Sequence, residues 1–476
     1  MSGPLWLTPD DRQDTLPAIP RPRPRWATAT AADPVDELAT RLHGLVAAAV
    51  HPDEIAAILE SDGMNDEHIR LTYGRANSFE LAEDLYARVP RAYPEPTLPP
   101  GDPWHVSLLP CLLRGLVFAL PGLAYVLGAP FATGSAPVAV LLASALTGWA
   151  WNQALAHRAY TWLGLGDRPA AARALLVGAP LGALLGTGVA LAVSGAGEGG
   201  AVAFASVQAL YQGAATVLLV LGRERLLLAA LAPMSAGAVL ALLYDVPDAA
   251  RLLLLAVSPL AVLVLAVAEL LRGVRGGRRG PGGPRVVASV PYGLFGLATG
   301  VLVLHVALGD VLAGGATGAA AAPGAVALTL SMGPAEWLLH RFRSGALAGL
   351  RAARTPGAFR RASALTLARC LGTYLLVLAV LASAGTLLWP QSEGLDGARA
   401  LGLLLVGTLM WTGLLLQAFG AVAVAATVCG AAAFAQTLAV LGGTTPTASL
   451  FAPAGAALVL TALACGTLGR ATAHRP

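Results

Sequence analysis

The sequence predicts an all-α, polytopic membrane protein that carries a small helical module ahead of its membrane part. Of its 476 residues, 56% are hydrophobic and only 12% are charged, whereas soluble globular chains carry about 25% charged residues. From residue 107 onward, apolar segments recur at the length of about 20 residues that a bilayer core requires of a helix. The arginines gather in alternate loops between these segments, and the chain contains no lysine.

The first hundred residues differ from the rest and hold 16 of the 27 acidic residues. Residues 1–32 are rich in Pro and Arg and lack the apolar region of a signal peptide, so we expect a disordered cytoplasmic tail. Residues 33–92 predict a helical module, because Asp33 and Pro34 are typical of a helix start. A second helix is expected to open at His51 and Pro52, and Asn65 and Ser78 are expected to cap two more. The Pro-rich linker 93–106 should be extended.

The membrane part is predicted to hold two bundles of six helices, 107–272 and 286–470, joined by a Gly/Arg-rich cytoplasmic linker, 273–285, and followed by a short tail, 471–476. The twelve segments are expected at about 107–128, 134–156, 171–193, 201–221, 226–244, 250–271, 286–308, 318–339, 365–388, 399–417, 420–441 and 451–470. The eighth is dominated by Ala and Gly. Prolines within segments are expected to kink their helices; these are Pro121, Pro180, Pro233, Pro259, Pro291 and Pro334.

The arginine distribution predicts the topology. Cytoplasmic loops carry an excess of Arg and Lys, and here the arginines follow the even-numbered segments, whereas the remaining loops hold only Arg251 and Arg399. The arginines after even-numbered segments are Arg158, Arg168, Arg173, Arg223, Arg225, Arg272, Arg275, Arg278, Arg279, Arg285, Arg341, Arg343, Arg351, Arg354, Arg360, Arg361, Arg470 and Arg475. Twelve segments with both termini cytoplasmic, in a bacterial plasma membrane, satisfy this rule.

A short internal similarity indicates duplication. Segments 2 and 8 end in the same pattern, Leu-x-His-Arg, which places His157 and His340 183 residues apart in the chain. Each pattern lies at the expected cytoplasmic edge and is followed by a basic loop. Internal repeats are a common plan among transporters.

The loop after segment 2 carries a resemblance to a known family. Its Gly164, Gly166, Asp167 and Arg168, after a polar-ended helix and before a small-residue helix start, resemble the loop between helices 2 and 3 of the multidrug/oligosaccharidyl-lipid/polysaccharide (MOP) superfamily. Two bundles of six helices also fit that plan. The resemblance implies a flippase or exporter that moves a lipid-linked or amphipathic substrate, such as a lipid-linked glycan, by alternating access. It implies no enzyme activity and no cofactor.

Other interpretations remain open. The major facilitator superfamily also has twelve helices, but its loop pattern G-x-x-x-D-R-x-G-R-R is matched only in part. The acidic module 33–92 is unusual for the MOP superfamily and favours a non-transporting scaffold that recruits a cytoplasmic protein partner. A membrane-embedded enzyme would need clustered Asp, Glu or His at a membrane edge.

Few polar residues lie within the predicted segments, and these are the candidates for a substrate pathway. Arg114 lies in segment 1, where a charge costs at least about 2.5 kcal/mol near the bilayer centre, so it must face a polar interior or reach the interface. Asn152 and Gln153 lie at the inner end of segment 2. The third group, Gln208, Tyr211 and Gln212, shares one face of segment 4.

Glu336 and His340 are spaced to form a local pair in segment 8, and an acid at membrane depth is a candidate for proton coupling. Glu269 is expected to pair with Arg272. The Arg-rich stretch 341–361 predicts an interfacial helix held by anionic membrane lipids, without nucleic acid. No metal site is expected, since Cys111, Cys370, Cys429 and Cys465 all lie singly in apolar segments and two groups do not make a zinc site.

Overall fold

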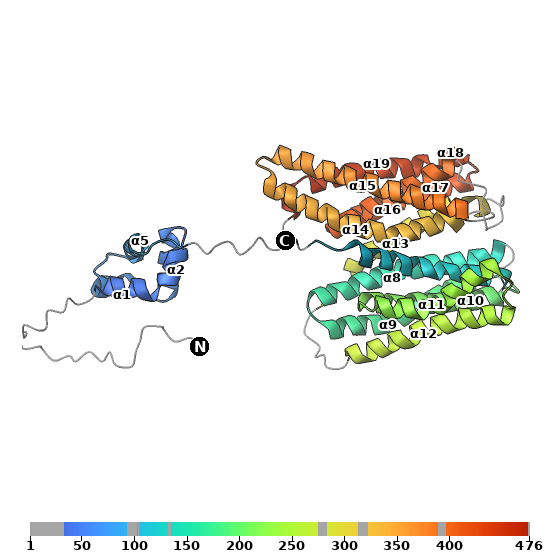
Figure 1. Cartoon of the computed structure of the whole chain (residues 1–476), viewed down its shortest axis with the longest axis horizontal. Coiled ribbons are helices and arrows are strands. Elements are labelled where there is room, and N and C mark those ends of the chain that lie inside the picture. The colour runs from blue at the N-terminus through green and yellow to red at the C-terminus, as the bar shows by residue number, and fades with distance from the viewer. Residues whose placement is uncertain are drawn as a thin grey trace, which may run out of the picture. The chain divides into compact units, whose positions relative to one another are not determined.

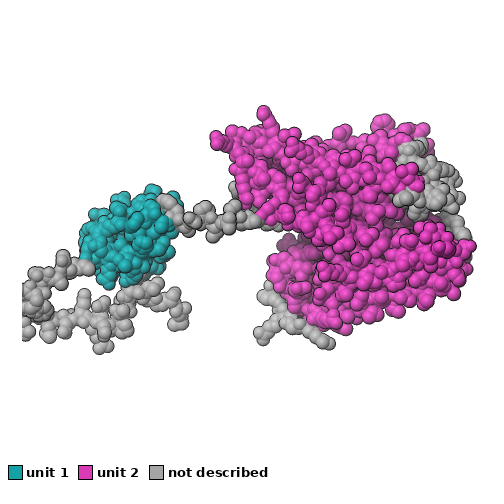
Figure 2. All heavy atoms as spheres, in the orientation of Figure 1, with its two compact units in different colours: residues 1–101 teal, residues 102–476 magenta. Residues whose placement is uncertain are grey.

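The structure is a computed structural model that describes residues 33–92, 102, 104–131, 135–274, 283–312, 322–388 and 397–474. Within these ranges, all regular secondary structure is helical. Packing divides the chain into two compact units, residues 1–101 and 102–476 (Figure 2). The predicted tail 1–32 and parts of both predicted linkers and of the C-terminal tail lie outside the described residues.

The first unit contains five short helices, and their starts follow from local capping. They are α1 (Pro34–Arg41), α2 (His43–Ala48), α3 (Pro52–Ser61), α4 (Asp66–Tyr73) and α5 (Ser78–Arg88). The side chains of Asp33, His51 and Asn65 cap α1, α3 and α4 as predicted. The prediction for α5 was wrong by one residue: Asn77 accepts the capping bond from the Glu80 N–H, because the Ser78 hydroxyl instead donates to Glu60 at 2.7 Å.

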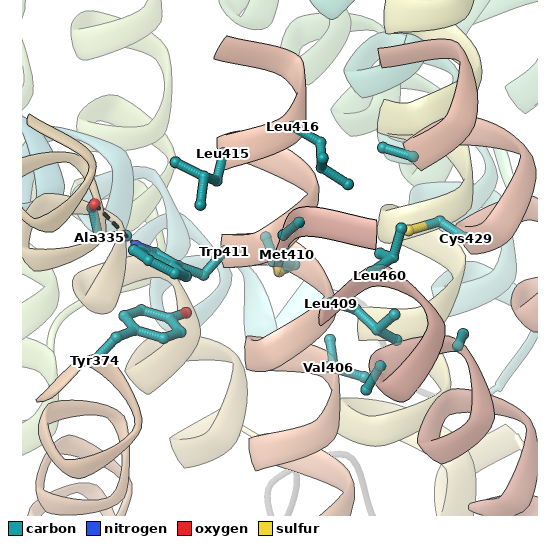
Figure 3. Close-up of a cluster of buried hydrophobic side chains, with 14 of the residues drawn as sticks. Ala335, Tyr374, Val406, Leu409, Met410, Trp411, Leu415, Leu416, Cys429 and Leu460 are labelled. Atoms are coloured by element: carbon teal, nitrogen blue, oxygen red, sulfur yellow. Dashed lines mark hydrogen bonds between the residues drawn. The ribbon is translucent and has the colours of Figure 1, made fainter. Parts of the chain in front are cut away.

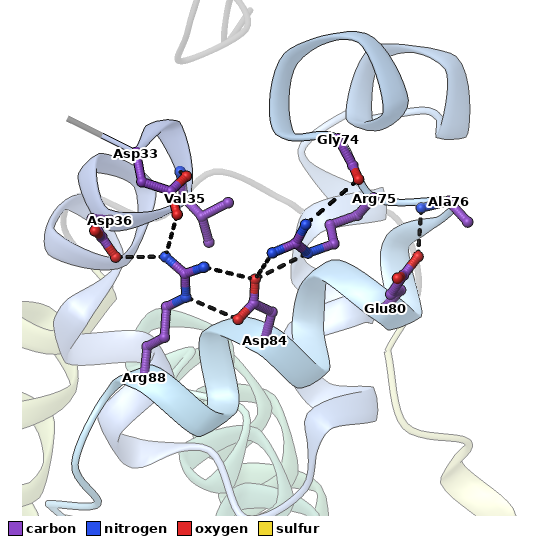
Figure 4. A network of polar contacts seen from close by, with 9 residues as sticks. All are labelled: Asp33, Val35, Asp36, Gly74, Arg75, Ala76, Glu80, Asp84 and Arg88. Atoms are coloured by element: carbon purple, nitrogen blue, oxygen red, sulfur yellow. Dashed lines mark hydrogen bonds and ion pairs between the residues drawn. The ribbon is translucent and has the colours of Figure 1, made fainter. Parts of the chain in front are cut away.

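A network of charged side chains crosses the surface of this first unit (Figure 4). Arg88 of α5 contacts Asp84 at 2.8 Å, Asp33 at 2.7 Å and Asp36 at 2.6 Å, and Arg75 contacts Asp84 at 2.5 Å. Partial burial acts to raise the pKa of Asp84, but hydrogen bonds from Arg88 and Arg75 outweigh it and hold that pKa below its ordinary value. The hydrogen bond from Arg88 likewise lowers the pKa of Asp33. The network therefore ties α1 to α5 over a core that includes Leu38, Leu59 and Leu85.

The second unit consists of long helices. It begins with α6 (Leu108–Ala119), a 3-10 turn (Leu120–Leu123) and α7 (Ala124–Gly128); it continues with α8 (Ser135–Gly164), α9 (Arg168–Val193), α10 (Gly199–Val220), α11 (Glu224–Leu243), α12 (Asp248–Val274), α13 (Val290–Leu312), α14 (Ala322–Ala352), α15 (Pro356–Leu388), α16 (Gly397–Ala418), α17 (Val422–Leu441), α18 (Pro446–Ser449) and α19 (Phe451–Leu468). Pro121 lies at the start of the 3-10 turn and interrupts the first of them, as a proline in a helix is expected to do.

Eleven helical segments among the described residues are long and apolar enough to cross a membrane. They correspond to every predicted segment except the eighth, so the chain is a multi-pass, all-α membrane protein by this criterion. The eighth prediction falls on α14, which is a helix of 31 residues but carries Glu336, His340 and three arginines.

The Arg-rich stretch 341–361 does not form the predicted interfacial helix. Residues 341–352 continue α14 and residues 356–361 already belong to α15, because Phe342 and Phe359 are buried and fix both helix ends to the rest of the unit. Consecutive long helices alternate in direction, so the turns after α8, α10, α14 and α19 lie at one end of the unit (left in Figure 1). We call this the Arg-rich end.

The two largest hydrophobic clusters of the second unit lie on either side of residues 273–285 in the chain. The buried residues of one lie between Val117 and Leu270, and those of the other between Phe295 and Leu468. We call residues 102–274 the first half and residues 283–474 the second half. In Figure 1 helices α8–α12, coloured from teal to yellow-green, form one group, and helices α14–α19, coloured from yellow-orange to red, form another.

The core of the second half centres on Trp411 (Figure 3). The side chain is fully buried, and its Nε1–H donates to the Ala335 carbonyl at 3.3 Å. The ring stacks on Tyr374 of α15, whose hydroxyl lies 3.1 Å from Ser331 Oγ of α14. The Trp411 N–H and the Tyr374 hydroxyl therefore both have hydrogen-bond partners. These contacts fix α14, α15 and α16 relative to one another.

Candidate functional site

Arg114 is the centre of a charged cluster at the interface between the two halves. Its Nε and Nη2 lie 2.8 Å and 2.6 Å from Oε1 of Glu224, and its Nη1 donates to Oε1 of Glu336. We call these residues the Arg114 triad. All three side chains are a quarter to a third exposed. Two carboxylates therefore hold the Arg114 side chain between the helices, and its predicted role in a substrate pathway stays a prediction.

The triad joins three helices that belong to different halves. Arg114 lies on α6 and Glu224 is the first residue of α11, so both belong to the first half, whereas Glu336 lies on α14 in the second half. A left-handed glycine, Gly222 with φ of 72°, ends α10 and lets the chain turn directly into α11. Glu224 is brought to Arg114 by this turn.

The α6–α14 interface is a contact between glycine backbones. A Cβ atom on Gly115 would lie 2.7 Å from the backbone nitrogen of Gly333, and a Cβ on Gly333 would lie 2.5 Å from the Cys111 carbonyl oxygen. No larger residue fits at either position without moving a helix. The absence of side chains lets α6 and α14 approach closely enough for Arg114 to reach Glu336.

A second interface between the halves, α8–α13, is built in a similar way. Gly293, Gly296 and Gly300 of α13 lie against α8, and a Cβ on Gly293 would lie 3.1 Å from the Ala150 carbonyl oxygen. The side chain of Gln153 packs on Gly296. In this interface Gln153 occupies the α8 position that corresponds to Glu336 of α14, if the two Leu-x-His-Arg patterns are superposed.

The histidines of the repeated pattern lie at these two interfaces. His157 of α8 stacks on Tyr292 of α13 with ring centroids 3.6 Å apart, and its Nδ1 lies 3.0 Å from Ser289 Oγ. His340 of α14 faces Trp104, which precedes α6, at 6.5 Å between ring centroids. Each histidine therefore contacts the start of the other half, as expected if the halves are related by duplication.

Glu336 and His340 do not form the predicted local pair. Glu336 is bonded to Arg114, while His340 Nδ1 is buried without a hydrogen-bond partner among the described residues. Arg343, one turn beyond His340, lies with its Cζ 4.2 Å from the centre of the Trp104 ring and donates to the Ala418 carbonyl. The predicted pair of Glu269 with Arg272 is confirmed at 2.6 Å, and Arg223 joins it at 2.9 Å.

The other predicted pathway residues do not gather at the triad. Asn152 donates to the Gly148 carbonyl of its own helix at 2.8 Å, and the Gln212 side chain packs against Gly148. The amide oxygens of Asn152 and Gln212 are buried and have no hydrogen-bond partner among the described residues. This pair lies within the first half, between α8 and α10.

The polar face predicted on segment 4 is divided between two surroundings. Gln208 accepts a hydrogen bond from the Tyr125 hydroxyl at 2.9 Å. Tyr211, which was predicted to act with it, packs against the hydrophobic cluster of the first half. Gln212, on the same face, packs on Gly148 of α8.

The loop residues that carry the family resemblance have a local structural role. Gly164 ends α8, and Gly166 takes a left-handed conformation with φ of 77°. The Asp167 side chain then caps α9 by accepting from the Ala170 N–H at 2.8 Å, and Arg168 is the first residue of that helix. The motif is thus a helix end followed by a helix cap.

Sequence reasoning missed Glu224. It lies 110 residues from Arg114 in the chain and next to Arg223 and Arg225, so it has the sequence context of an ordinary loop acid. Its position at the first turn of a helix was the one available signal, because acidic residues favour helix N-termini.

Comparison with known proteins gave no match: no family model, no curated protein and no solved structure is similar to this chain. The resemblance to the MOP superfamily therefore remains a prediction that depends on Gly164, Gly166, Asp167 and Arg168. What the structure establishes is a multi-pass helical membrane protein with a charged cluster between its two halves.

Proposed function

We propose that this protein is a membrane transporter of the flippase or exporter type, without enzyme activity, in which two six-helix bundles alternate between conformations open to either side of a bacterial plasma membrane. The Arg-rich end would face the cytoplasm, where arginine-rich loops are retained. In this proposal α14 is the twelfth spanning helix, and its charged residues face the partner half rather than lipid. The expected substrate is a lipid-linked or amphipathic molecule, and no metal or cofactor is required.

The observation that carries the proposal is the ion pair between Arg114 and Glu336. It connects two halves that otherwise have separate hydrophobic clusters. A pair of opposite charges that spans two independently packed bodies at one end can form and break as the bodies move, whereas a charge within one core cannot. The glycine contact beside it places the backbone of α6 against that of α14.

The proposal is tested by transport in liposomes that contain the purified protein. A fluorescent polyprenyl-linked glycan and an amphipathic dye are the two probes, and their movement is followed by quenching from outside. We expect Arg114→Ala to reduce movement at least tenfold, about the effect of losing a contact worth 1.4 kcal/mol in the limiting step. Arg369→Ala, which removes an exposed arginine of α15, serves as the matched control and should leave movement unchanged.

The same assay distinguishes a transporter from a non-transporting scaffold. The first unit folds around its own core, which suits a module that recruits a cytoplasmic protein. A chain that lacks residues 1–101 should still move the probes if transport resides in the second unit. If neither the full chain nor any variant moves either probe, while removal of residues 1–101 abolishes the cellular role, the scaffold is the function and transport is rejected.

A further inference from the structure

The Arg114 triad contains one more acid than base. Arg114 is bonded by both carboxylates, Glu224 through Nε and Nη2 and Glu336 through Nη1. With all three groups ionised, the triad carries a net charge of −1. A buried carboxylate is unfavourable when no positive charge contacts it. The position of Arg114 therefore decides which of the two carboxylates is left without a partner.

The two carboxylates differ in the half from which they come. Glu224 and Arg114 belong to the first half, whereas Glu336 belongs to the second half. If the halves part at this end, Arg114 keeps Glu224 and the two form a neutral pair. Glu336 then loses its only ion-pair partner among the described residues.

Among the described residues, Glu336 has no ion-pair partner other than Arg114. At the contact with α6, Gly115 and the Cys111 backbone lie against Gly333 of α14, and neither residue carries a positive charge.

The remaining neighbours of α14 do not change this balance. On α14 itself, the His340 ring lies 6.5 Å from that of Trp104, and its Nδ1 has no hydrogen-bond partner among the described residues. Among the described side chains on elements packed against α14, Tyr374 of α15 is bonded to Ser331, Tyr292 of α13 stacks on His157, and the His474 ring lies 6.5 Å from that of Phe342, with its Nε2 2.8 Å from the Leu468 carbonyl oxygen.

We propose that Glu336 is a proton-binding site that takes up one proton when the two halves part at the Arg-rich end, and that Glu224 retains Arg114 on the first half during this step. The inference rests on the proposed function and specifies its coupling. The proton adds to a carboxylate oxygen of Glu336 as the bond from Arg114 Nη1 breaks, and it leaves when that bond re-forms. By linkage, a group that binds a proton more tightly in the open form makes acid favour opening.

Isosteric substitution of the two carboxylates should therefore have opposite effects. Glu336→Gln removes the attraction between the halves and leaves a neutral pair, Arg114 with Glu224, in both forms, so it should favour the open form. Glu224→Gln leaves Arg114 with Glu336 alone. Opening would then separate two unpaired charges, so the closed form should be favoured.

The experiment measures the distance between the halves directly and not through transport. Spin labels are placed at Leu165→Cys, after α8, and Ala352→Cys, at the end of α14, both exposed, in the full chain in nanodiscs with its native cysteines replaced by alanine. Distance distributions are recorded by pulsed electron resonance between about pH 5 and about pH 8. For one linked proton, the open-to-closed ratio should rise by up to about tenfold for each pH unit of acidification.

The variants give the decisive comparison. Glu336→Gln should be mostly open and lose the pH dependence, while Glu224→Gln should be mostly closed. Glu269→Gln is the matched control, because Glu269 is also shared by two arginines but lies entirely within the first half; it should behave like the parent. The pH titration of the parent needs no variant, so it remains informative if Glu336→Gln fails to fold.

Three results would overturn the inference. One is a parent protein that opens and closes with no pH dependence; another is a shift of both Gln variants in the same direction. In either case the two states, and with them the proposed transport, would stand without proton coupling at Glu336. A single distance at every pH in all variants, together with no movement of either probe in liposomes, would reject the proposed function as well.

Discussion

Arg88 and Arg114 are each held by more than one carboxylate, and their surroundings give the two clusters different consequences. Arg88 lies on the surface of the first unit, where its side chain is 28% exposed, and water screens each of its ion pairs. Arg114 lies between helices and contacts one carboxylate from each half. The first cluster can stabilise only its own unit. The second cluster would lose the Arg114–Glu336 ion pair if the two halves separated.

The Arg88 cluster predicts an acid-sensitive first unit. Because the pKa of Asp84 and that of Asp33 are lowered in the folded state, their contribution is present above the unfolded pKa and is lost as pH falls through the folded one. We expect residues 33–92, expressed alone, to lose stability below about pH 4. Arg88→Gln should lower the free energy of unfolding at neutral pH by about 1 kcal/mol and weaken the acid sensitivity. Urea unfolding followed by circular dichroism measures both.

Arg70→Gln is the control for that experiment, since Arg70 is an exposed residue of α4. Equal losses for the two variants, or stability that is unchanged between pH 3 and pH 7 in the parent, would show that the ion pairs contribute nothing measurable.

At the scale of elements, two helix pairs connect the halves, and both depend on glycine. In α6–α14 the close approach is Gly115 against Gly333, and in α8–α13 it is Gly293 against Ala150. With the Leu-x-His-Arg patterns superposed, Ala150 corresponds to Gly333. The two interfaces are thus similar in packing but different in chemistry, because one holds a triad of charges and the other holds His157 stacked on Tyr292.

Gly333→Leu should separate α6 from α14. The added side chain would meet the backbone at Cys111 and Leu112, and such overpacking typically costs about 1–3 kcal/mol. We expect a lower midpoint of thermal unfolding in detergent, measured by size-exclusion chromatography after heating. Gly372→Leu on α15, where an added Cβ meets nothing within 4 Å, should leave the midpoint unchanged. A midpoint equal to that of the parent in Gly333→Leu would mean that the two helices do not touch in solution.

The elements themselves were largely predictable from the sequence, but their contacts were not. Hydropathy and length located eleven of the helices, and the caps at Asp33 and Asn65 followed from local chemistry. Segment 8 was the least certain by composition, and α14 proved to extend through the stretch expected to be a separate interfacial helix. Local pattern cannot show that Phe342 and Phe359 are buried, because their partners lie far away in the chain.

The contacts within the candidate site were also not predictable from local sequence patterns. Arg114 could be identified from the sequence because a charge in an apolar segment is energetically costly. Glu336 could be identified because it is an acid in segment 8. Their pairing joins residues 222 positions apart, and the third member, Glu224, had the context of a loop residue. Spacing along one helix suggested that Glu336 would meet His340, whereas packing between helices brought it to Arg114.

At the scale of the whole molecule, the second unit is one compact unit that contains two large, separate hydrophobic clusters. Buried side chains of one half are grouped with each other and not with those of the other half. The contacts between the halves include glycine packing, the stacked pair of His157 and Tyr292, the contact of Arg343 with Trp104 and the ion pair of Arg114 with Glu336. This arrangement favours assembly of each half before the halves meet.

Chains cut within residues 273–285 should therefore reassemble. We expect the two fragments, co-expressed with an affinity tag on the first only, to be recovered together in about equal amounts, because each can form its own core before association. Quantitative blotting of the purified complex measures the recovery. Gly333→Leu in the second fragment should reduce it severalfold, and Gly372→Leu should not. Fragments that enter the membrane but are never recovered together would contradict two separately packed halves.

The paired glycine contacts also have a mechanical consequence. The approach of Gly115 to Gly333 and that of Gly293 to Ala150 are two points at which backbone rests on backbone, and two points define an axis. A rocking rotation about that axis keeps both backbone contacts intact. It converts a small displacement at these contacts into a larger one at the far ends of the long helices. Arg114 and Glu336 lie next to the Gly115–Gly333 contact, so a small displacement that breaks their ion pair accompanies a larger displacement at the far ends, and one proton could bias the position of several helices at once.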